Sequence, residues 1–315
     1  MHLVDRVLIV GTVLVVLPAT LSLLANQIWW CELLAHFRLH YVVAGLPLLA
    51  GWVVRRRWSA AVGMGALLLI VGLTAIPPWR VRPFPPTRGT RLVVANINLL
   101  SSNDDHAGVA RFVTDSEASV VVVEELTPRW VEALESIPGY TLKGAVPDDE
   151  GNFGIGLLVA DTAADLVTLR PAWDVDGYPT VEAWIRVGPA VYALLGIHPP
   201  PPASRELAGA RDATFVEVAA WSRRQRGARR FPIVLGDFNV TPYAPAFRRL
   251  IHEGKLVDSR TGVQATFPSS LGPFGLPIDH CLHSRDLVAV ERRVGPDVGS
   301  DHRPIVVTLV RRSRA

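Results

Sequence analysis

Apolar residues are distributed unevenly along the chain. Three stretches near the N-terminus, 7–25, 41–54 and 59–76, carry no charged side chain. A helix needs roughly 20 apolar residues to cross a bilayer. The first and third stretches qualify, whereas the second spans only by borrowing flanking residues such as Leu39 and His40. The pattern predicts a membrane anchor over residues 1–78, with transmembrane helices at about 7–26, 39–54 and 58–77.

A cleaved signal peptide is the alternative explanation of the first stretch. Its start, MHLVDR, carries little charge, and no small-residue cleavage site follows the apolar run cleanly. Two further apolar stretches also follow it, which favours the anchor. The Pro-rich segment 79–90 then predicts an extended linker.

The pattern changes after this linker, where short β-branched runs alternate with amphipathic ones. Strands are predicted at 91–97, 118–126, 154–160, 180–187, 190–198, 231–239, 277–284 and 303–310. Helices are predicted at about 105–117, 128–137, 204–226 and 244–254. This alternation favours a layered α/β sandwich over residues 91–315.

Composition narrows the classes of partner. The chain has 32 basic and 29 acidic residues, of which five and two lie in the first 78 positions, so 27 of each remain and the later domain is formally neutral. A nucleic-acid-binding domain usually has a basic surplus, so neutrality counts against that class, although a local basic patch stays open. The two cysteines, Cys31 and Cys281, exclude a disulfide framework and a Cys metal site.

Polar side chains stand where several predicted strands end. In FPIVLGDFNV, Asp237 and Asn239 are two residues apart and therefore share one side of the strand. Each such residue alone has an ordinary explanation, but together they favour a site, because ligands gather at strand ends in layered sheets. The set is Asn96, Asn98, Glu125, His198, Asp237, Asn239, Asp279, His280, Ser300, Asp301 and His302.

These residue types suit one chemistry. Converging carboxylates repel one another unless a hard cation is present, and oxygen ligands favour Mg²⁺ or Mn²⁺ over Zn²⁺. Histidines beside them can bind an anionic oxygen or donate a proton. The combination predicts hydrolysis of a phosphate ester or anhydride.

The stretches ANIN, VVVEEL, GIHP, GDFN, IDHC and GSDHRP, spanning 95–304 in this order, resemble the endonuclease/exonuclease/phosphatase superfamily. The resemblance implies the pancreatic-type deoxyribonuclease fold, a four-layer α/β/β/α sandwich, and a divalent-metal-dependent phosphoric ester hydrolase. It implies that Glu125 is the principal metal ligand, supported by Asn96 and Asp301. The implied catalytic and substrate-contacting set is His198, Asp237, Asn239, Asp279 and His302, with Asn98 also at the substrate.

Within this set the resemblance assigns separate roles. Asp237 orients or deprotonates the attacking water, while Asn239 holds the phosphate or that water. His302 contacts the scissile phosphate and is oriented by Asp279, and His198 makes a second phosphate contact. His280 alternates away from Asp279 and is interpreted as structural.

Some positions depart from the family pattern. The family commonly reads Gln-Glu where this chain has Glu124-Glu125, and often has an acid where Asn98 stands. Strand alternation makes Glu125 the site residue if the strand continues that far, which leaves Glu124 open between a structural and a functional role.

The architecture of helices followed by this domain also resembles the VanJ-type teicoplanin-resistance proteins, which implies cell-envelope metabolism or glycopeptide resistance. The compact triplet Arg55–Arg57 favours a cytoplasmic hairpin and an extracytoplasmic catalytic domain. Arginines after the third stretch weigh against that orientation. The expected location is the cell membrane, with several spans.

Three functions remain open. The first is a membrane-anchored phosphohydrolase acting with Mg²⁺ or Mn²⁺ on a lipid-linked or membrane-proximal phosphate, such as undecaprenyl pyrophosphate. The second is a tethered nuclease acting on DNA or RNA, which the neutral domain disfavours. The third is an inactive binding module, which the complete set of polar residues disfavours. The apolar residues of 199–211 and 269–277 suit an apolar ligand, and ordinary loop structure explains them equally well.

Overall fold

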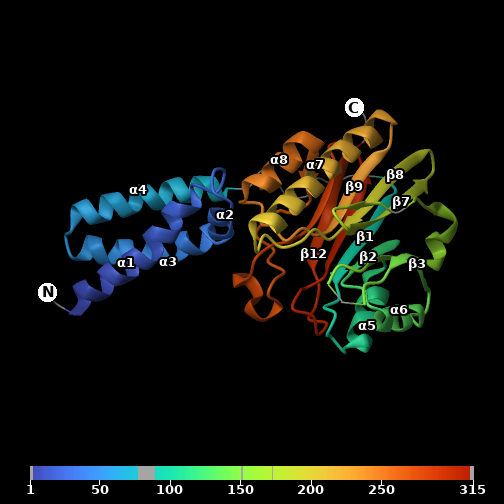
Figure 1. Cartoon of the computed structure of the whole chain (residues 1–315), viewed down its shortest axis with the longest axis horizontal. Helices are drawn as coiled ribbons and strands as arrows, with labels where there is room; N and C mark the ends of the chain where they lie inside the picture. The colour runs from blue at the N-terminus through green and yellow to red at the C-terminus, as the bar shows by residue number, and fades with distance from the viewer. Residues whose placement is uncertain (1–2, 77–88, 150–151, 172, 313–315) are drawn as a thin grey trace.

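The computed structural model describes residues 3–76, 89–149, 152–171 and 173–312. A helical module, defined as residues 3–76, adjoins one end of a sandwich of two β-sheets (Figure 1). The module comprises α1 (Leu3–Ser22), α2 (Trp29–Ala35), α3 (Arg38–Val54) and α4 (Trp58–Ala75). The predicted linker at 79–90 lies almost entirely outside the described residues.

The first sheet has six strands in the order β12-β13-β1-β2-β4-β3. Its strands are β1 (Arg91–Asn98), β2 (Val120–Glu124), β3 (Tyr140–Val146), β4 (Ile155–Ala160), β12 (Leu287–Val294) and β13 (Ile305–Arg311). The second sheet has seven strands in the order β10-β11-β9-β8-β7-β5, with β6 paired to β7. These are β5 (Val167–Leu169), β6 (Asp174–Val175), β7 (Tyr178–Val187), β8 (Ala190–Ile197), β9 (Phe231–Asp237), β10 (Leu256–Asp258) and β11 (Asp279–Ser284).

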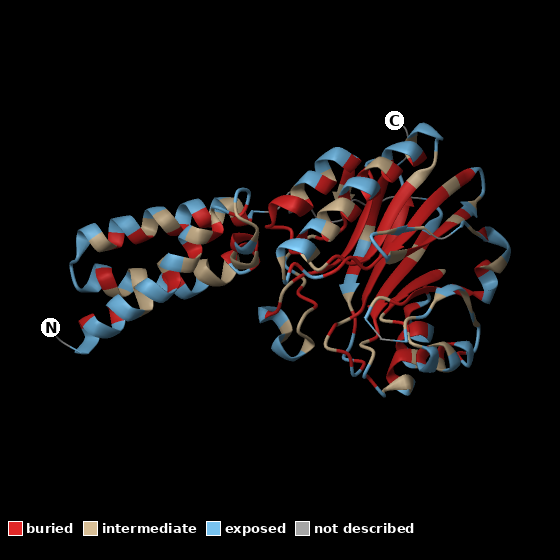
Figure 2. Cartoon of the chain, viewed as in Figure 1, coloured by how far each residue is buried: buried red, intermediate tan, exposed pale blue. Residues whose placement is uncertain are grey.

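Helices cover the outer face of each sheet, which confirms the predicted four-layer α/β/β/α sandwich. On the first sheet lie α5 (His106–Ser116) and α6 (Pro128–Glu135), and on the second lie α7 (Arg205–Gly227) and α8 (Pro245–Gly254). The two short 3₁₀ helices are η1 (Asp161–Leu166) and η2 (Ser269–Phe274). The largest core lies between the sheets, where alternate residues such as Val94, Val122 and Leu235 meet (Figure 2).

All eight predicted strands and four predicted helices of this domain are confirmed, with each end within two residues of the predicted one. The strands β3, β5, β6, β10 and β12 were not predicted from the sequence. The strand β3 is only partly buried along its length, so its sequence lacks the apolar alternation of a core strand. The strands β5, β6 and β10 have three residues or fewer, too few to show a period.

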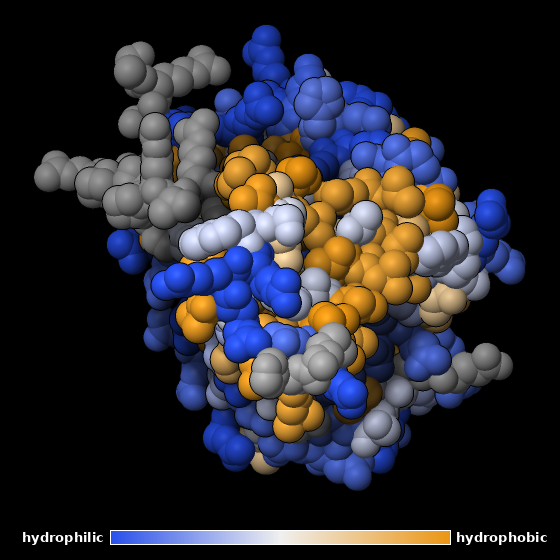
Figure 3. Space-filling model, turned by 90° about the vertical axis from the view of Figure 1, so that its left-hand side faces the viewer, coloured by the Kyte–Doolittle hydropathy of each residue, from blue (hydrophilic) through white to orange (hydrophobic). Residues whose placement is uncertain are grey.

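The helical module exposes apolar side chains along its length. Two helices, α1 and α4, are long and apolar enough to cross a membrane, and a third span results if α2 and α3, bent by 59°, are counted together. Exposed apolar residues include Leu14, Val43 and Leu69. Figure 3, which looks at the molecule from the side of this module, shows apolar surface gathered there. Such a surface is unusual on a soluble monomer.

Buried polar contacts hold the module against the sandwich. Arg211 of α7 is fully buried and donates to Glu32 of α2 at 2.8 Å. Arg38, at the start of α3, donates to the carbonyl of Tyr243 at 2.9 Å. Arg248 of α8 donates to the carbonyl of Thr74, at the end of α4. The interface between the module and the sandwich is therefore built from α2, the start of α3 and the end of α4 on one side. On the other side it is built from α7, α8 and the loop that contains Tyr243.

Candidate active site

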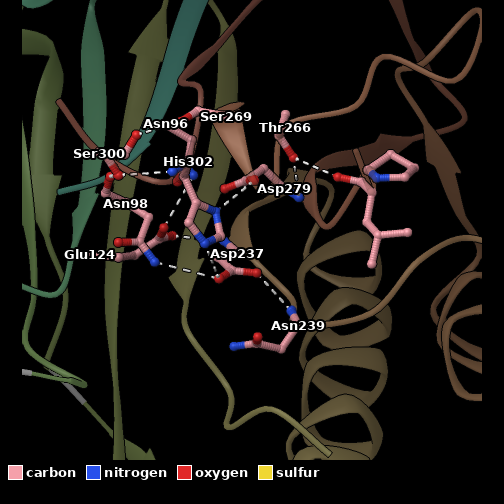
Figure 4. A network of polar contacts seen from close by, with 12 residues as sticks. Asn96, Asn98, Glu124, Asp237, Asn239, Thr266, Ser269, Asp279, Ser300 and His302 are labelled. Carbon is pink, nitrogen blue, oxygen red and sulfur yellow. Dashed lines mark hydrogen bonds and ion pairs between the residues drawn. The ribbon is translucent and has the colours of Figure 1, made fainter. Parts of the chain in front are cut away.

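The candidate site continues the core between the two sheets. Val94, Val122 and Leu235 point into that core from β1, β2 and β9. Side chains two residues apart face the same side of a strand. Toward the end of each strand, the residues that continue on this core-facing side are polar. These positions are Asn96, Asn98, Glu124, His198, Asp237 and Asp279, each no more than 5% exposed. Figure 4 labels all of them except His198.

Glu124 bonds to both sheets. Its carboxylate accepts from Asn96 Nδ2 at 3.2 Å within the first sheet and from the Asp237 backbone N–H at 3.0 Å in the second. Gly236 permits this approach, because a Cβ there would lie 2.7 Å from Glu124 Oε1. Burial, together with the carboxylates of Asp237 and Asp279, raises the pKa of Glu124 well above its ordinary value.

The expectation that β2 continues through Glu125 is wrong. The strand ends at Glu124, and Glu125 adopts a left-handed conformation with φ of 53°. That turn takes its side chain out of the strand's alternation. Glu125 Oε1 instead accepts from Asn98 Nδ2 at 3.0 Å, and Oε2 accepts from the Ser101 backbone N–H at 3.0 Å. Of the two carboxylates, Glu124 is therefore the one held between Asn96 and Asp237.

Asp237 stands between two histidines. Its Oδ2 lies 3.6 Å from His198 Nε2 and 3.6 Å from His302 Nε2. The other oxygen accepts from the Asn239 backbone N–H at 2.8 Å. Burial alone would raise the pKa of Asp237, but His302 and His198 outweigh it and hold this pKa below its ordinary value. A buried carboxylate kept ionised in this way can accept a proton from a water molecule.

His302 is oriented by a buried carboxylate. Its Nδ1 lies 3.0 Å from Asp279 Oδ2, and its ring lies 4.8 Å from the ring of Phe267. Burial alone would lower the pKa of His302, but Asp279 and Asp237 raise it to about 10. The imidazole is therefore protonated at neutral pH. A cation with one N–H fixed by Asp279 leaves Nε2 to address an anionic oxygen or a leaving group.

The remaining predicted residues lie around this centre. Asn98 Nδ2 lies 3.5 Å from Asp237 Oδ2, and Asn239 donates from Nδ2 to the Pro199 carbonyl at 3.0 Å. Ser300 fixes the last motif, since its Oγ donates to the Asn98 carbonyl at 2.8 Å and accepts from the His302 N–H. His280 is fully buried away from this group and faces the Val240 carbonyl at 2.7 Å, as its structural interpretation requires.

Two oxygens of the site are suited to a cation. Asn96 Oδ1 and Asp301 Oδ1 are buried and accept no hydrogen bond from the described residues. Burial and the carboxylates of Asp237 and Asp279 raise the pKa of Glu124, and a bound cation would favour its charged form. An oxygen donor set of this kind fits a hard divalent cation. Asp237, Asp279 and His302 also converge, with ligand atoms within 4.8 Å of one another, but Asp279 and His302 already bond to each other.

If the ion binds, Glu124, Asn96 and Asp301 would hold it, and it would neutralise charge on the reacting phosphoryl group. The protein's own groups supply the remaining chemistry. Asp237 can take a proton from the attacking water. His302 and His198 can contact the phosphoryl oxygens, and Asn239 can hold the substrate or the water.

Comparisons with known proteins identify the family of the sandwich domain. The model of the "Endonuclease/Exonuclease/phosphatase family" matches residues 93–302. A family protein from Bacteroides thetaiotaomicron has a similar structure, with a TM-score of 0.57, 19% identity, and coverage of 72% of this chain and 100% of that one. No curated protein matches the sequence significantly.

Two further similar structures have a named activity or a bound ligand. A mannosyl-6-phosphatase from Bacteroides thetaiotaomicron is 19% identical with a TM-score of 0.54, and the match covers 70% of this chain and 99% of that one. TDP2 from D. rerio, complexed with a single-strand DNA product, is 13% identical with a TM-score of 0.53, covering 70% and 99%. At these identities the likeness shows the fold. The family match covers more than half of the chain, so the protein belongs to the endonuclease/exonuclease/phosphatase family, whose members are divalent-metal-dependent hydrolases.

Proposed function

We propose that this member of the endonuclease/exonuclease/phosphatase family hydrolyses a phosphate ester or pyrophosphate borne by a membrane lipid, with Mg²⁺ or Mn²⁺ as its ion. Glu124, Asn96 and Asp301 hold the ion, Asp237 activates water, and His302, His198 and Asn239 contact the phosphoryl group. Glu124 replaces Glu125 as the principal ligand, because Glu124 lies in phase with the other site residues.

The observation that carries the proposal is the contact between the helical module and a loop of the site. Asn239 and Thr241 lie on the loop between β9 and α8. His36, between α2 and α3, faces Thr241 Oγ1 at 3.0 Å, and Arg38 binds the Tyr243 carbonyl on the same loop. The site therefore lies at the end of the sandwich that adjoins the apolar helices. A lipid-borne phosphate is concentrated there, while soluble polyanions are not.

The charged residues at one end of the module support a catalytic domain outside the cell. Arg55 Nε donates to Asp5 at 3.0 Å, so the Arg55–Arg57 turn lies beside the start of α1. Figure 1 shows this end of the module pointing away from the sandwich. By the positive-inside rule the basic turn is cytoplasmic, which places the catalytic domain outside the cell. Substrates of the cell envelope, including lipid carriers relevant to glycopeptide resistance, would meet the site on that side.

The test compares three substrates of the purified full-length protein with Mg²⁺. Release of phosphate from a polyprenyl pyrophosphate and of the head group from a phospholipid is measured beside nicking of supercoiled plasmid. We expect turnover of at least one lipid, lost in Asp237→Ala. Plasmid nicking that disappears in Asp237→Ala, with every lipid intact, would replace the proposal with the tethered nuclease.

A further inference from the structure

The segment 266–274 connects the site to the helical module. At one end the Phe267 ring packs 4.8 Å from the His302 ring. Ser269 then donates from its backbone N–H to the Asp301 carbonyl at 2.7 Å and from Oγ to the Ser300 carbonyl at 2.9 Å. The other end of the segment is η2, which ends at Phe274. The position of η2 is therefore fixed relative to the His302 loop.

The helix η2 exposes two large apolar side chains. Phe274 is 70% exposed and Leu271 is 53% exposed. Among the described residues from 89 onward, no other large apolar side chain is as exposed as Phe274. Single apolar residues on a surface need no explanation, but two in one six-residue segment that contacts an apolar helical module do.

A hydrogen bond between His40 and the Phe274 carbonyl holds η2 beside the first turn of α3. His40 Nε2 lies 2.7 Å from the Phe274 carbonyl, and His40 is in the first turn of α3. The 17 residues of α3 extend about 25 Å. That length is below the roughly 30 Å of a hydrocarbon core, so a spanning α3 cannot raise its first turn far above the apolar layer. Phe274 then lies at the membrane–water boundary.

We infer that η2 is a membrane-contact element, in which Leu271 and Phe274 insert into the headgroup–acyl boundary of the bilayer that holds the helical module. The segment 266–274 thereby holds the His302 loop of the site close to the lipid surface. This consequence rests on the proposed function: a phosphate on a lipid head group reaches His302 while its acyl chains stay in the bilayer. Residues of this type are common in interfacial segments.

A fluorescent probe tests the location of η2 without requiring any activity. Phe274→Cys and, as the matched control, Leu166→Cys are labelled with an environment-sensitive dye in full-length protein in nanodiscs. Leu166 is also exposed, at 41%, but lies on η1, which packs on β4, β5 and β7. The native Cys31 and Cys281 are buried.

The expected result is blue-shifted emission from the dye at 274 and its quenching by lipids with a nitroxide on the acyl chain. The dye at 166 should remain in water and unquenched. Equal, water-like emission and quenching at both positions would overturn the inference. That result would leave the proposed function standing, because a lipid phosphate could still be hydrolysed by a site held above the surface.

Steady-state kinetics test whether membrane contact by η2 brings the site to a lipid-borne phosphate. Burial of one Leu or Phe is worth roughly ten- to a hundredfold in an equilibrium constant. For Leu271→Ser/Phe274→Ser we expect KM for a polyprenyl pyrophosphate in vesicles to rise about tenfold or more, with kcat changed less than about threefold. Turnover of soluble p-nitrophenyl phosphate should not change. An unaltered KM in vesicles, or an equal loss on the soluble ester, would contradict a membrane-contact role.

Discussion

The strand β9 joins two unlike ends of the sandwich. It ends at Asp237, among His198, His302 and buried carboxylates, beside the helical module. It begins at Phe231, which lines a cavity of about 1020 Å³ at the opposite end. That cavity is bordered by Arg223, Arg226, Arg229, Arg230, Lys255, Arg311 and Arg312, with Asp286 among them. The two ends are about 20 Å apart along the strand.

The difference explains how a neutral domain can hold both a phosphate site and a strongly basic surface. Positive charge that gathers polyanions is concentrated at the end away from Asp237. At the site, two buried histidines face the Asp237 carboxylate, and the pKa of one of them, His302, is raised to about 10. An extended nucleic acid bound on the basic end would therefore have to reach around the sandwich to meet the site. A lipid phosphate at the helical end would not.

The largest effect is expected at the site end. In the proposed mechanism, truncation of His302 removes a protonated group that contacts the phosphoryl oxygen mainly in the transition state. We expect His302→Ala to lower turnover of the lipid phosphate by about 10²-fold or more, without loss of the fold. His252→Ala, on the exposed last turn of α8, is the control and should keep full turnover. Near-normal turnover of a folded His302→Ala protein would remove His302 from the site.

The two neighbouring glutamates give the next effect. Glu124 faces Asn96 and Asp237, whereas Glu125 faces Asn98 and the Ser101 N–H. Glu124→Gln should therefore raise the Mg²⁺ concentration for half-maximal activity by at least about tenfold, and by more than Glu125→Gln does. Metal titrations of both variants give the comparison. The opposite order would assign the ion to Glu125.

The interface near the site end should affect stability more than chemistry. Glu32 is 5% exposed and its partner Arg211 is fully buried, so Glu32→Gln leaves a buried guanidinium poorly paired. Such a loss costs about 3 kcal/mol of unfolding free energy. Asp212 remains beside Arg211 and will reduce the effect. Denaturation of full-length protein in micelles, combined with Arg211→Met in a double-mutant cycle, measures the coupling. Full additivity would contradict a shared interface.

The smallest effect is expected at the basic end. Arg223→Ser/Arg226→Ser removes two cations that border the cavity and donate to the carbonyls of Glu253 and Lys255. Turnover of the lipid phosphate should stay within about twofold of the unaltered protein, because screened charges this far from Asp237 act weakly on the site. A large loss, or a change confined to plasmid nicking, would show that the two ends cooperate on a polyanion.

Much of the sandwich could be predicted from the sequence because its core strands alternate or run apolar between clear breaks. The motifs at the strand ends also predicted which polar residues meet. The sequence could not predict which residues of β2 face the site. Its four consecutive valines, residues 120–123, are all buried, so the strand shows no alternation of apolar and polar positions. The left-handed turn at Glu125 then decided which glutamate faces Asp237, and no neighbouring Gly or Pro signals that turn.

The periodicity of apolar residues could not predict how the helical module packs on the sandwich either. His36 meets Thr241 and Arg38 meets Tyr243 across 205 positions of sequence. Such pairs depend on tertiary packing, so local patterns contain no signal for them. The apolar residues of η2 were noticed in the sequence, but ordinary loop structure explained them as well. Their exposure and the contact of Phe274 with His40 are the observations on which the inferred membrane contact of η2 rests.

Surface dilution is the most direct test of the account, because it asks whether substrate reaches the site from the bilayer. Full-length protein and a polyprenyl pyrophosphate are held at constant bulk concentration with Mg²⁺, while inert phosphatidylcholine is added to the same vesicles. If the enzyme hydrolyses a lipid-borne phosphate, phosphate release falls with the surface mole fraction of substrate, and hydrolysis of p-nitrophenyl phosphate does not change. A rate that follows bulk concentration alone, or no lipid turnover beside efficient plasmid nicking, would contradict it.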